Sequence, residues 1–342
     1  MGFSTKVIKR IVNGSLKNFD NSVNKLYLNY IGEDSTLLCF MFHAIFTNQG
    51  ERDSNLIDPN LGVDLGDFKI FIEYLLDNDY NFIELDDIIL GLENDGKYAI
   101  ITFDDGYYNN TNIIPILDEY QIPAIIFPTP KNIIEEKSFW WDVVYRERTK
   151  RNESYNIISK EIEFLKLRKI YQIDEYIIDT FGIESFKPLS DLDRPFLNNE
   201  IKQIYNNMWI KLGNHTFSHA VLTNYSSSEI REEINLAQDF IFGITGIQQQ
   251  SISYPNGCYT NEIILISEDL GIKIGLSVIP EKNQLSLIRN NRSKLILLNR
   301  FNISGNVNIL NQLDIIRSDL IQLTDLKERI IIGSKKYLGM FK

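Results

Sequence analysis

Two short motifs carry residues that could bind a metal ion and activate water. The first, Thr102–Gly106, reads TFDDG and holds two adjacent carboxylates. The second, His215–His219, reads HTFSH and holds two of the chain's three histidines, four residues apart. Two imidazoles at this spacing can face one point, and a carboxylate from the first motif would complete three metal ligands. Three protein ligands leave a coordination position open for water, as in catalytic metal sites.

The predicted ligands are Asp105, His215 and His219, and zinc fits this set of two nitrogens and one oxygen best. Cobalt, nickel, manganese or iron would also suit it. A divalent ion lowers the pKa of its bound water and polarises a carbonyl group. Because Asp105 is the predicted ligand, the remaining carboxylate, Asp104, is free to act as the general base. Each motif alone has a plain alternative, because Asp-Asp-Gly is ordinary turn sequence and an isolated histidine pair is as often coincidence as a metal site.

The elements that must position these residues follow the pattern of β–α units from residue 36 onward. The predicted strands are residues 37–42, 82–85, 98–103, 124–127, 209–212, 252–254, 274–278 and 296–298, and the predicted helices include 65–77, 198–205 and 227–242. Polar residues follow directly after several of these strands. In a parallel barrel such positions share one rim, where we expect to find His43, Asp104, Asp105, His215, Asn256 and Arg300.

The predicted fold class is therefore α/β, a deformed (β/α) barrel of about seven strands over residues 36–304. Between about residues 128 and 195 the alternation gives way to a charged, mostly helical pattern, which we interpret as an insertion that acts as a lid or an interface. Residues 1–35 and 305–342 are predicted to be helical end segments with basic and apolar residues at amphipathic spacing. Such ends can contact an anionic membrane surface, although packing on the body or on a second subunit is the commoner role.

Composition limits the partners and the compartment. The net charge of −11 disfavours a nucleic-acid partner, because phosphate binding relies on clustered lysine and arginine. The two cysteines, Cys39 and Cys258, cannot form a disulfide framework. The start lacks a signal-peptide pattern, and no apolar run is long enough to span a bilayer. We therefore expect a cytoplasmic protein, with membrane association on the inner face through its basic ends.

Taken together, the motifs resemble those of the polysaccharide deacetylases of carbohydrate esterase family 4. TFDDG resembles the family's first motif, in which the first Asp is the catalytic base and the second binds metal. HTFSH resembles the second motif, which supplies both metal histidines. YPNG at Tyr254–Gly257 resembles the third, whose backbone amide helps bind the oxyanion. The resemblance spans about residues 36–304 and implies a metal-dependent hydrolase that removes N-acetyl groups from an amino-sugar glycan, such as a cell-surface polysaccharide, or from its precursor.

Two departures resemble the circularly permuted branch of that family, which includes deacetylases of poly-N-acetylglucosamine. Ser253 stands where the third motif usually has an Arg that pairs with the base, and no histidine follows His219. The permuted branch has its general-acid histidine early, after the first strand, and His43 stands in that place. Arg300 is the candidate partner for Asp104, with a surface ion pair as the alternative. Taken alone, His43 would more often be a hydrogen-bonded core residue.

The resemblance implies that a backbone amide around Asn256 to Cys258 holds the oxyanion, with Asn256 and Gly257 as the candidate residues. Tyr254 and Tyr107 are further candidates for substrate contact, and Trp141 is a candidate for stacking on a sugar ring. Three functions stay open: deacetylation of a glycan or its precursor, deformylation or amide hydrolysis of small or lipid-linked sugars, and carbohydrate binding without catalysis. Metal content distinguishes carbohydrate binding without catalysis from the two enzymatic functions, because a degenerate barrel has no reason to keep a complete ligand set.

Overall fold

The structure is a computed structural model, and it describes residues 21–93, 95–289, 295–318 and 320. The chain divides into two compact units, residues 1–34 together with 307–342, and Ser35–Asn306. In the first unit residues 21–30 are helical, α14 spans Ile309–Arg317, and Arg317 Nη2 lies 2.8 Å from Glu33 Oε1. The predicted amphipathic stretches at residues 7–16 and 329–342 lie outside the described residues.

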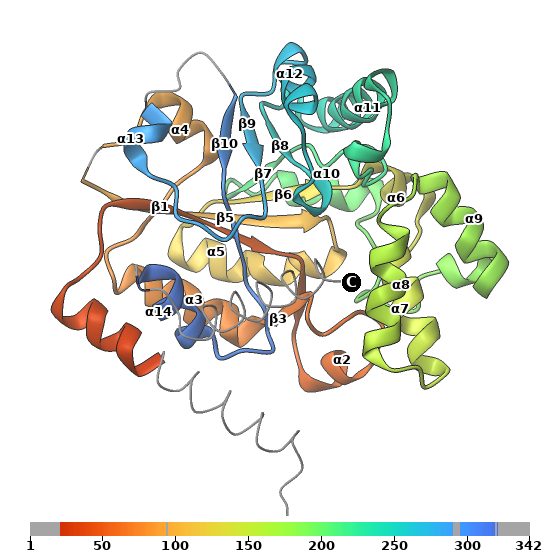
Figure 1. Cartoon of the computed structure of the whole chain (residues 1–342), viewed down its shortest axis with the longest axis horizontal. Helices are drawn as coiled ribbons and strands as arrows, with labels where there is room; N and C mark the ends of the chain where they lie inside the picture. Colours follow the sequence, from red (N-terminus) through yellow and green to blue (C-terminus); the bar gives the residue numbers. More distant parts are fainter. Residues whose placement is uncertain (1–20, 94, 290–294, 319, 321–342) are drawn as a thin grey trace, which may run out of the picture. The chain divides into compact units, whose positions relative to one another are not determined.

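The larger unit is built on parallel strands, and its central sheet has the order β11-β1-β5-β6-β7 with β4 beside β5. Figure 1 labels β1, β5, β6 and β7 of this sheet. A second sheet has the order β10-β9-β8, and a third pairs β2 with β3. A single parallel bridge, Asn214–Ile252, connects the end of β7 to β8. The strands are β1 (Thr36–Phe42), β2 (Ala44–Phe46), β3 (Gly62–Asp64), β4 (Asn81–Phe82), β5 (Lys97–Asp105), β6 (Ala124–Pro128), β7 (Ile210–Leu212), β8 (Ser251–Ser253), β9 (Ile274–Leu276), β10 (Ile296–Leu298) and β11 (Phe301–Asn302).

Strands β1 and β5 lie at the centre because each is a nearly continuous apolar run, as expected for parallel strands covered on both faces. All seven residues of β1 are buried. Phe40 and Phe42 contact Phe71 of α3 (Leu65–Leu76) edge to face, with ring centroids 4.8 and 5.1 Å apart. Full burial of one such side chain stabilises the fold by roughly 1.5–3 kcal/mol, so this aromatic layer gives the strands a rigid support.

Helices cover the sheets, and their buried faces follow the helical period. In α3 the buried residues are Phe68, Phe71, Ile72 and Leu75. Helix α11 (Ser227–Thr245) begins with a capping box, in which the backbone amide and hydroxyl of Ser226 both donate to Glu229. The other helices are α2 (Gln49–Asp53), α4 (Leu85–Leu90), α5 (Ile114–Tyr120), α6 (Pro130–Glu135), α7 (Trp140–Lys150), α8 (Tyr155–Leu165), α9 (Ile170–Phe181), α10 (Asn198–Tyr205), α12 (Asn261–Asp269) and α13 (Leu285–Arg289), with 3₁₀ turns η1 (Tyr108–Ile113), η2 (Ile183–Phe186), η3 (Leu222–Asn224) and η4 (Pro255–Gly257).

The segment predicted to be an insertion contains α6 to α9, and α7 contacts both α8 and α9 (green in Figure 1). These helices bury an apolar cluster that includes Trp140, Val144, Ile158 and Ile173. The same cluster takes in Tyr107 from the turn after β5. The helical segment is therefore packed against the strand end that carries Asp104 and Asp105.

The predicted α/β class with a parallel sheet is confirmed. The described residues contain eleven strands. The sequence does not predict β2, β3 or β11, because strands of two or three residues leave no clear periodic signal. The predicted strand at residues 82–85 is wrong in extent, since β4 ends at Phe82 and α4 already begins at Leu85. Among the described residues, no helix combines the length and apolar character needed to cross a membrane.

Candidate metal centre and active site

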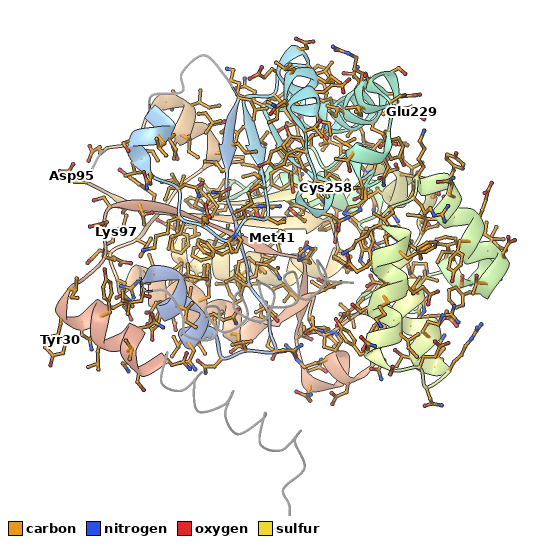
Figure 2. The ribbon with its side chains drawn as sticks, viewed as in Figure 1. Tyr30, Met41, Asp95, Lys97, Glu229 and Cys258 are labelled. Atoms are coloured by element: carbon orange, nitrogen blue, oxygen red, sulfur yellow. The ribbon has the colours of Figure 1, made fainter. Side chains whose placement is uncertain are left out.

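A cavity of about 670 Å³ lies where the strands of the larger unit end. Figure 2 labels two residues of its wall, Met41 from β1 and Cys258 after η4. The same wall contains five of the six predicted rim residues, namely His43, Asp104, Asp105, His215 and Asn256, and it also contains His219. The structure thus brings together residues from four separate strand ends, and it places Arg300 directly behind Asp104 rather than in the wall.

Asp104 and Asp105 end β5, and the backbone turns at this point. Asp105 has φ 71° and Gly106 has φ 81°, both in the left-handed region. A Cβ on Gly106 would lie 2.9 Å from Cα of Pro128, so both the conformation and the space require glycine. Adjacent residues of a regular strand point to opposite faces, whereas this turn brings both carboxylates to the cavity.

The loop that carries His215 and His219 follows β7 and is held by α11. The backbone amide and hydroxyl of Ser218 donate to the two carboxylate oxygens of Glu233, at 2.9 and 2.7 Å. The amide of Phe217 donates to the carbonyl of Glu233 at 2.9 Å. The sequence does not single out Glu233, because the helical pattern alone cannot distinguish it from a solvent-facing glutamate.

Asp105, His215 and His219 form a buried cluster whose ligand atoms all lie within 4.8 Å of one another. Nε2 of each histidine lies 3.4 Å from Asp105 Oδ1. Ligands held at 2.0–2.1 Å by a tetrahedral ion are about 3.3 Å apart, so the spacing fits a divalent metal. Nδ1 of His215 lies 2.7 Å from the carbonyl oxygen of Ser253 and donates to it, which leaves Nε2 as the free ligand atom. Nδ1 of His219 is buried without a hydrogen-bond partner.

The protonation of the two histidines also suits a ligand cluster. Burial, above all, lowers the pKa of His219 to about 3, so this imidazole is neutral and its ring nitrogen can bind a metal. Burial acts in the same direction on His215, but the carboxylates of Asp104 and Asp105 outweigh it and raise the pKa. A divalent cation in the cluster would take the place of the proton that these carboxylates attract.

Asp104 is held by Arg300 in a bidentate ion pair. Nη1 and Nη2 of Arg300 donate to Oδ1 and Oδ2 of Asp104, each at 2.8 Å. The remaining N–H groups of Arg300 donate to Thr102 Oγ1, Ser253 Oγ and the carbonyl of Ser277, at 2.9, 2.8 and 3.0 Å. Arg300 is fully buried, so the alternative of a surface ion pair is wrong.

This pair decides the charge of Asp104. Burial would raise the pKa of its carboxyl, but the Arg300 guanidinium and the nearby histidines hold the pKa well below the usual range. The hydroxyl of Ser253 also donates to Asp104 Oδ2, at 3.0 Å. Ser253, which stands at the position of the expected motif arginine, therefore helps to link Asp104 to the arginine that the chain supplies from elsewhere.

His43 lies between β1 and β2, partly exposed in the wall of the cavity. Two asparagines of η1 fix its backbone: Asn110 Nδ2 donates to the carbonyl of His43 at 2.6 Å, and Asn109 Oδ1 accepts from the amide of Ile45 at 2.8 Å. The imidazole thus faces the same cavity as Asp104 and the metal cluster. The sequence does not reveal the two asparagines, because nothing in their spacing marks a contact with β2.

The YPNG turn contributes fewer groups to the cavity than the sequence predicted. Tyr254 is fully buried and donates to Ser267 Oγ at 3.2 Å, away from the cavity wall. The amides of Gly257 and Cys258 donate inside the turn, to the carbonyls of Tyr254 and Pro255, so they are not free to bind an oxyanion. Asn256 does line the cavity, in a left-handed conformation with φ 54°, and its Nδ2 is buried without a hydrogen-bond partner.

Tyr107 does not reach the cavity, because it is fully buried behind Trp141. Its hydroxyl donates to Asp142 Oδ2 at 2.7 Å and accepts from Trp141 Nε1 at 2.9 Å. The ring of Trp141 lines the cavity and lies 4.5 Å from the ring of His219, centroid to centroid. Tyr107 and Asp142 therefore fix the indole that covers one metal-ligand candidate.

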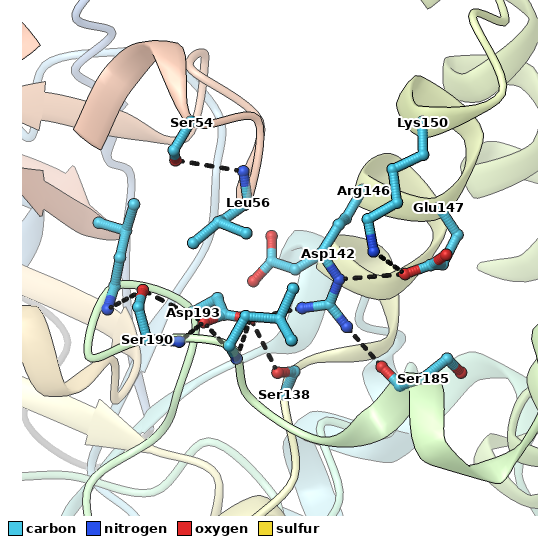
Figure 3. Close-up of polar contacts among 12 residues, drawn as sticks. Ser54, Leu56, Ser138, Asp142, Arg146, Glu147, Lys150, Ser185, Ser190 and Asp193 are labelled. Carbon is cyan, nitrogen blue, oxygen red and sulfur yellow. Dashed lines mark hydrogen bonds and ion pairs between the residues drawn. The ribbon is translucent and has the colours of Figure 1, made fainter. Parts of the chain in front are cut away.

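A second buried Arg–Asp pair stabilises the helical segment (Figure 3). Arg146 of α7 pairs with Asp193, and both side chains are almost completely buried. Asp193 also accepts from the amides of Leu189 and Ser190 at 3.0 and 2.8 Å and from Ser138 Oγ at 3.3 Å. Neither member of the pair lines the cavity.

The sequence model of the polysaccharide deacetylase family matches residues 91–275, more than half of the chain. The chain belongs to this family. The match includes Asp104, Asp105 and both histidines of the cluster, whereas His43 and Arg300 lie outside it. No curated protein sequence matches the chain.

Solved structures of family members share the fold. The Streptococcus pyogenes deacetylase PplD, solved in complex with acetate, is 17% identical, with a TM-score of 0.56 over 83% of this chain and 100% of that one. IcaB from Ammonifex degensii is 12% identical, with a TM-score of 0.55 over 84% and 99%. BC0361, a polysaccharide deacetylase from Bacillus cereus, is 16% identical, with a TM-score of 0.55 over 83% and 70%. At these identities the likeness supports the deacetylase fold alone.

Proposed function

We propose that this protein is a metal-dependent hydrolase that removes the N-acetyl group from an amino sugar of a glycan or its precursor. The observation that carries the proposal is the convergence, in one cavity, of the Asp105–His215–His219 cluster with the Arg300-paired Asp104 and with His43. Family membership supports deacetylation of a glycan, and the cluster supports a divalent metal, of which zinc is our first choice.

Each residue of the site has a role in this reaction. Asp105, His215 and His219 would hold the ion, whose chemistry is to polarise the acetamide carbonyl and acidify water. Asp104, ionised by Arg300, accepts the proton of the attacking water. His43 donates a proton to the amine as it leaves. Asn256, which lines the cavity, is our candidate for contact with the oxyanion.

The test measures metal stoichiometry and acetate release in the same preparation, purified without chelator, with N-acetylglucosamine oligomers as substrate. We expect about one ion per chain, as one three-ligand site implies, together with acetate release. Asp105→Asn, His215→Ala and His219→Ala should each lose the metal and the activity together. Protein that stays metal-free under replete conditions would exclude the proposal and favour a binding protein.

Deformylation or amide hydrolysis of small or lipid-linked sugars is the other enzymatic function compatible with the same residues. Metal binding without acetate release, combined with formate release from N-formylated sugars, would select it. The proposed compartment, the cytoplasm with contact to the inner membrane face, bears on this choice, because a cytoplasmic enzyme meets sugar precursors rather than finished wall polymer.

A further inference from the structure

The cavity extends from the metal cluster to a wall formed by α8. Tyr155, Ser159, Ile162 and Glu163 of this helix line the cavity, together with Lys166 at its end. Their spacing, 0, 4, 7, 8 and 11 residues, places the five side chains on one face of a helix. This face offers an aromatic ring, a hydroxyl group and two charged groups, although α8 lies in the segment predicted to be an insertion rather than in the strands that hold the catalytic candidates.

Tyr155 is exposed yet fixed in place. Its side chain is 52% exposed, and its hydroxyl donates to Asp58 Oδ2 at 2.9 Å and accepts from Asn60 Nδ2 at 3.0 Å. Oδ1 of Asp58 accepts from the amide and side chain of Asn60, at 2.9 and 2.8 Å. Exposed tyrosines without such contacts are free to rotate about χ1, so two hydrogen bonds to a loop 95–97 residues away make this ring a preformed surface.

The loop with Asp58 and Asn60 is connected to the catalytic candidates. The amide of Leu61 donates to the carbonyl of Asp58 at 2.9 Å, and the amide of Ala44 donates to the carbonyl of Leu61 at 3.1 Å. Strand β3, which begins at the next residue, pairs with β2. The loop is therefore fixed one residue beyond His43, and Asp58, Asn60 and Tyr155 all line the same cavity as His43.

We propose that Asp58, Asn60 and Tyr155 form a second sugar subsite, so that the protein binds at least two linked sugar units with the reacting N-acetyl group at the Asp104 end. A pyranose has an apolar C–H face, which suits an exposed aromatic ring, and hydroxyl groups, which can donate to the carboxylate of Asp58. The cavity volume of about 670 Å³ is within the range of roughly 300–1,000 Å³ typical of organic-ligand sites. This inference rests on the proposed function.

The test compares acetate release from N-acetylglucosamine with release from its trimer in the metal-loaded, full-length protein. We expect Tyr155→Ala to raise KM for the trimer by roughly three- to ten-fold, the effect of a lost aromatic contact, and to change KM for the monosaccharide by less. Asn60→Ala, at an exposed position, should shift the trimer KM in the same direction by less. Tyr171→Ala is the matched control, because Tyr171 is 55% exposed on α9 and does not line the cavity.

A trimer KM that is the same in wild type, Tyr155→Ala and Asn60→Ala would overturn the subsite and leave the deacetylase intact. If no acetate is released at all, trimer binding is measured by fluorescence of Trp140 and Trp141, which line the same cavity. Binding that weakens in Tyr155→Ala but not in Tyr171→Ala would then support the subsite although the proposed reaction had failed. Binding that is equal in both variants would overturn it.

Discussion

Within the part of the chain that the structure describes, two arginine–aspartate pairs are buried, and they differ in what the carboxylate can reach. Arg300 and Asp104 lie at the end of the central sheet, and Asp104 lines the cavity. Arg146 and Asp193 lie in the helical segment, and Asp193 is closed in by two backbone amides and a serine hydroxyl. Burial with a guanidinium partner is common to both, so burial and charge do not single out Asp104, the proposed general base. The two carboxylates differ in their access to the cavity.

The largest difference between the two pairs should be in turnover, when each carboxylate is replaced by an amide. Asp104→Asn should keep its metal and lose about 10²–10⁴-fold in turnover, because a positioned general base contributes that much. Asp193→Asn should keep the turnover of the folded protein. Acetate release per folded chain, measured beside metal content, tests both. Equal turnover in metal-loaded Asp104→Asn and wild type would exclude Asp104 as the base.

Replacing either arginine should lower the free energy of unfolding by a similar amount. Arg300→Met and Arg146→Met each leave a buried carboxylate without its partner, which typically lowers the free energy of unfolding by about 3–5 kcal/mol. Urea unfolding measures this loss for each variant. Only Arg300→Met should also reduce acetate release per folded chain, and a similar reduction in Arg146→Met would contradict the distinction between the pairs.

Another buried carboxylate, Asp142, sharpens the comparison because its partner is the phenol of Tyr107 rather than an arginine. Burial raises the pKa of Asp142 well above its ordinary value. In the unfolded chain this group loses its proton near pH 3.9, so the unfolded state is favoured as the pH rises above that value and stability falls.

Asp142→Asn should therefore flatten the dependence of stability on pH. The amide oxygen can still accept from Tyr107, and no proton has to be retained in the folded state. Urea unfolding at pH 5, 7 and 9 should show a gain over wild type that grows with pH. Parallel curves for the two proteins would show that Asp142 does not hold its proton in the folded state.

The smallest difference between the two pairs should be in stability, when the serine that contacts each pair is replaced by alanine. Ser253→Ala leaves an N–H of buried Arg300 without an acceptor, and an unpaired buried donor lowers stability by about 1–3 kcal/mol. Ser138→Ala removes only one of several donors to Asp193, so we expect a loss of roughly 0.5–1.5 kcal/mol. Thermal unfolding compares them, and a larger loss in Ser138→Ala would reverse the expected order.

The sequence predicted the fold class and the position of most rim residues because long strands and helices leave periodic patterns. Helix α10 has the predicted bounds, and His43, Asp104, Asp105, His215, His219 and Asn256 all line one cavity. The motifs by themselves left Arg300 undecided, since its contact with Asp104 joins residues 196 positions apart. Long-range pairing of this kind has no local signature.

The wrong expectations concern side-chain direction and local hydrogen bonds. Tyr107 and Tyr254 lie within two residues of Asp105 and Asn256, yet both rings are buried away from the cavity. Their aromatic character fits a sugar site and a core equally well. The amides of Gly257 and Cys258 are used within their own turn, which only the backbone conformation of Asn256 reveals. Glu233 and Asp142 act on the site from helices whose sequences look ordinary.

The parallel pairing of β1 with both β5 and β11 has a consequence for the nascent chain. Ribosomes deliver the N-terminal part first, so Asp104 leaves the exit tunnel nearly two hundred residues before Arg300. Until Arg300 emerges, the carboxylate of Asp104 has no guanidinium partner, and its burial away from water would be unfavourable. The β5 end should therefore stay hydrated during most of translation, and the cavity wall around Asp104 should form among the last regions of Ser35–Asn306 to fold.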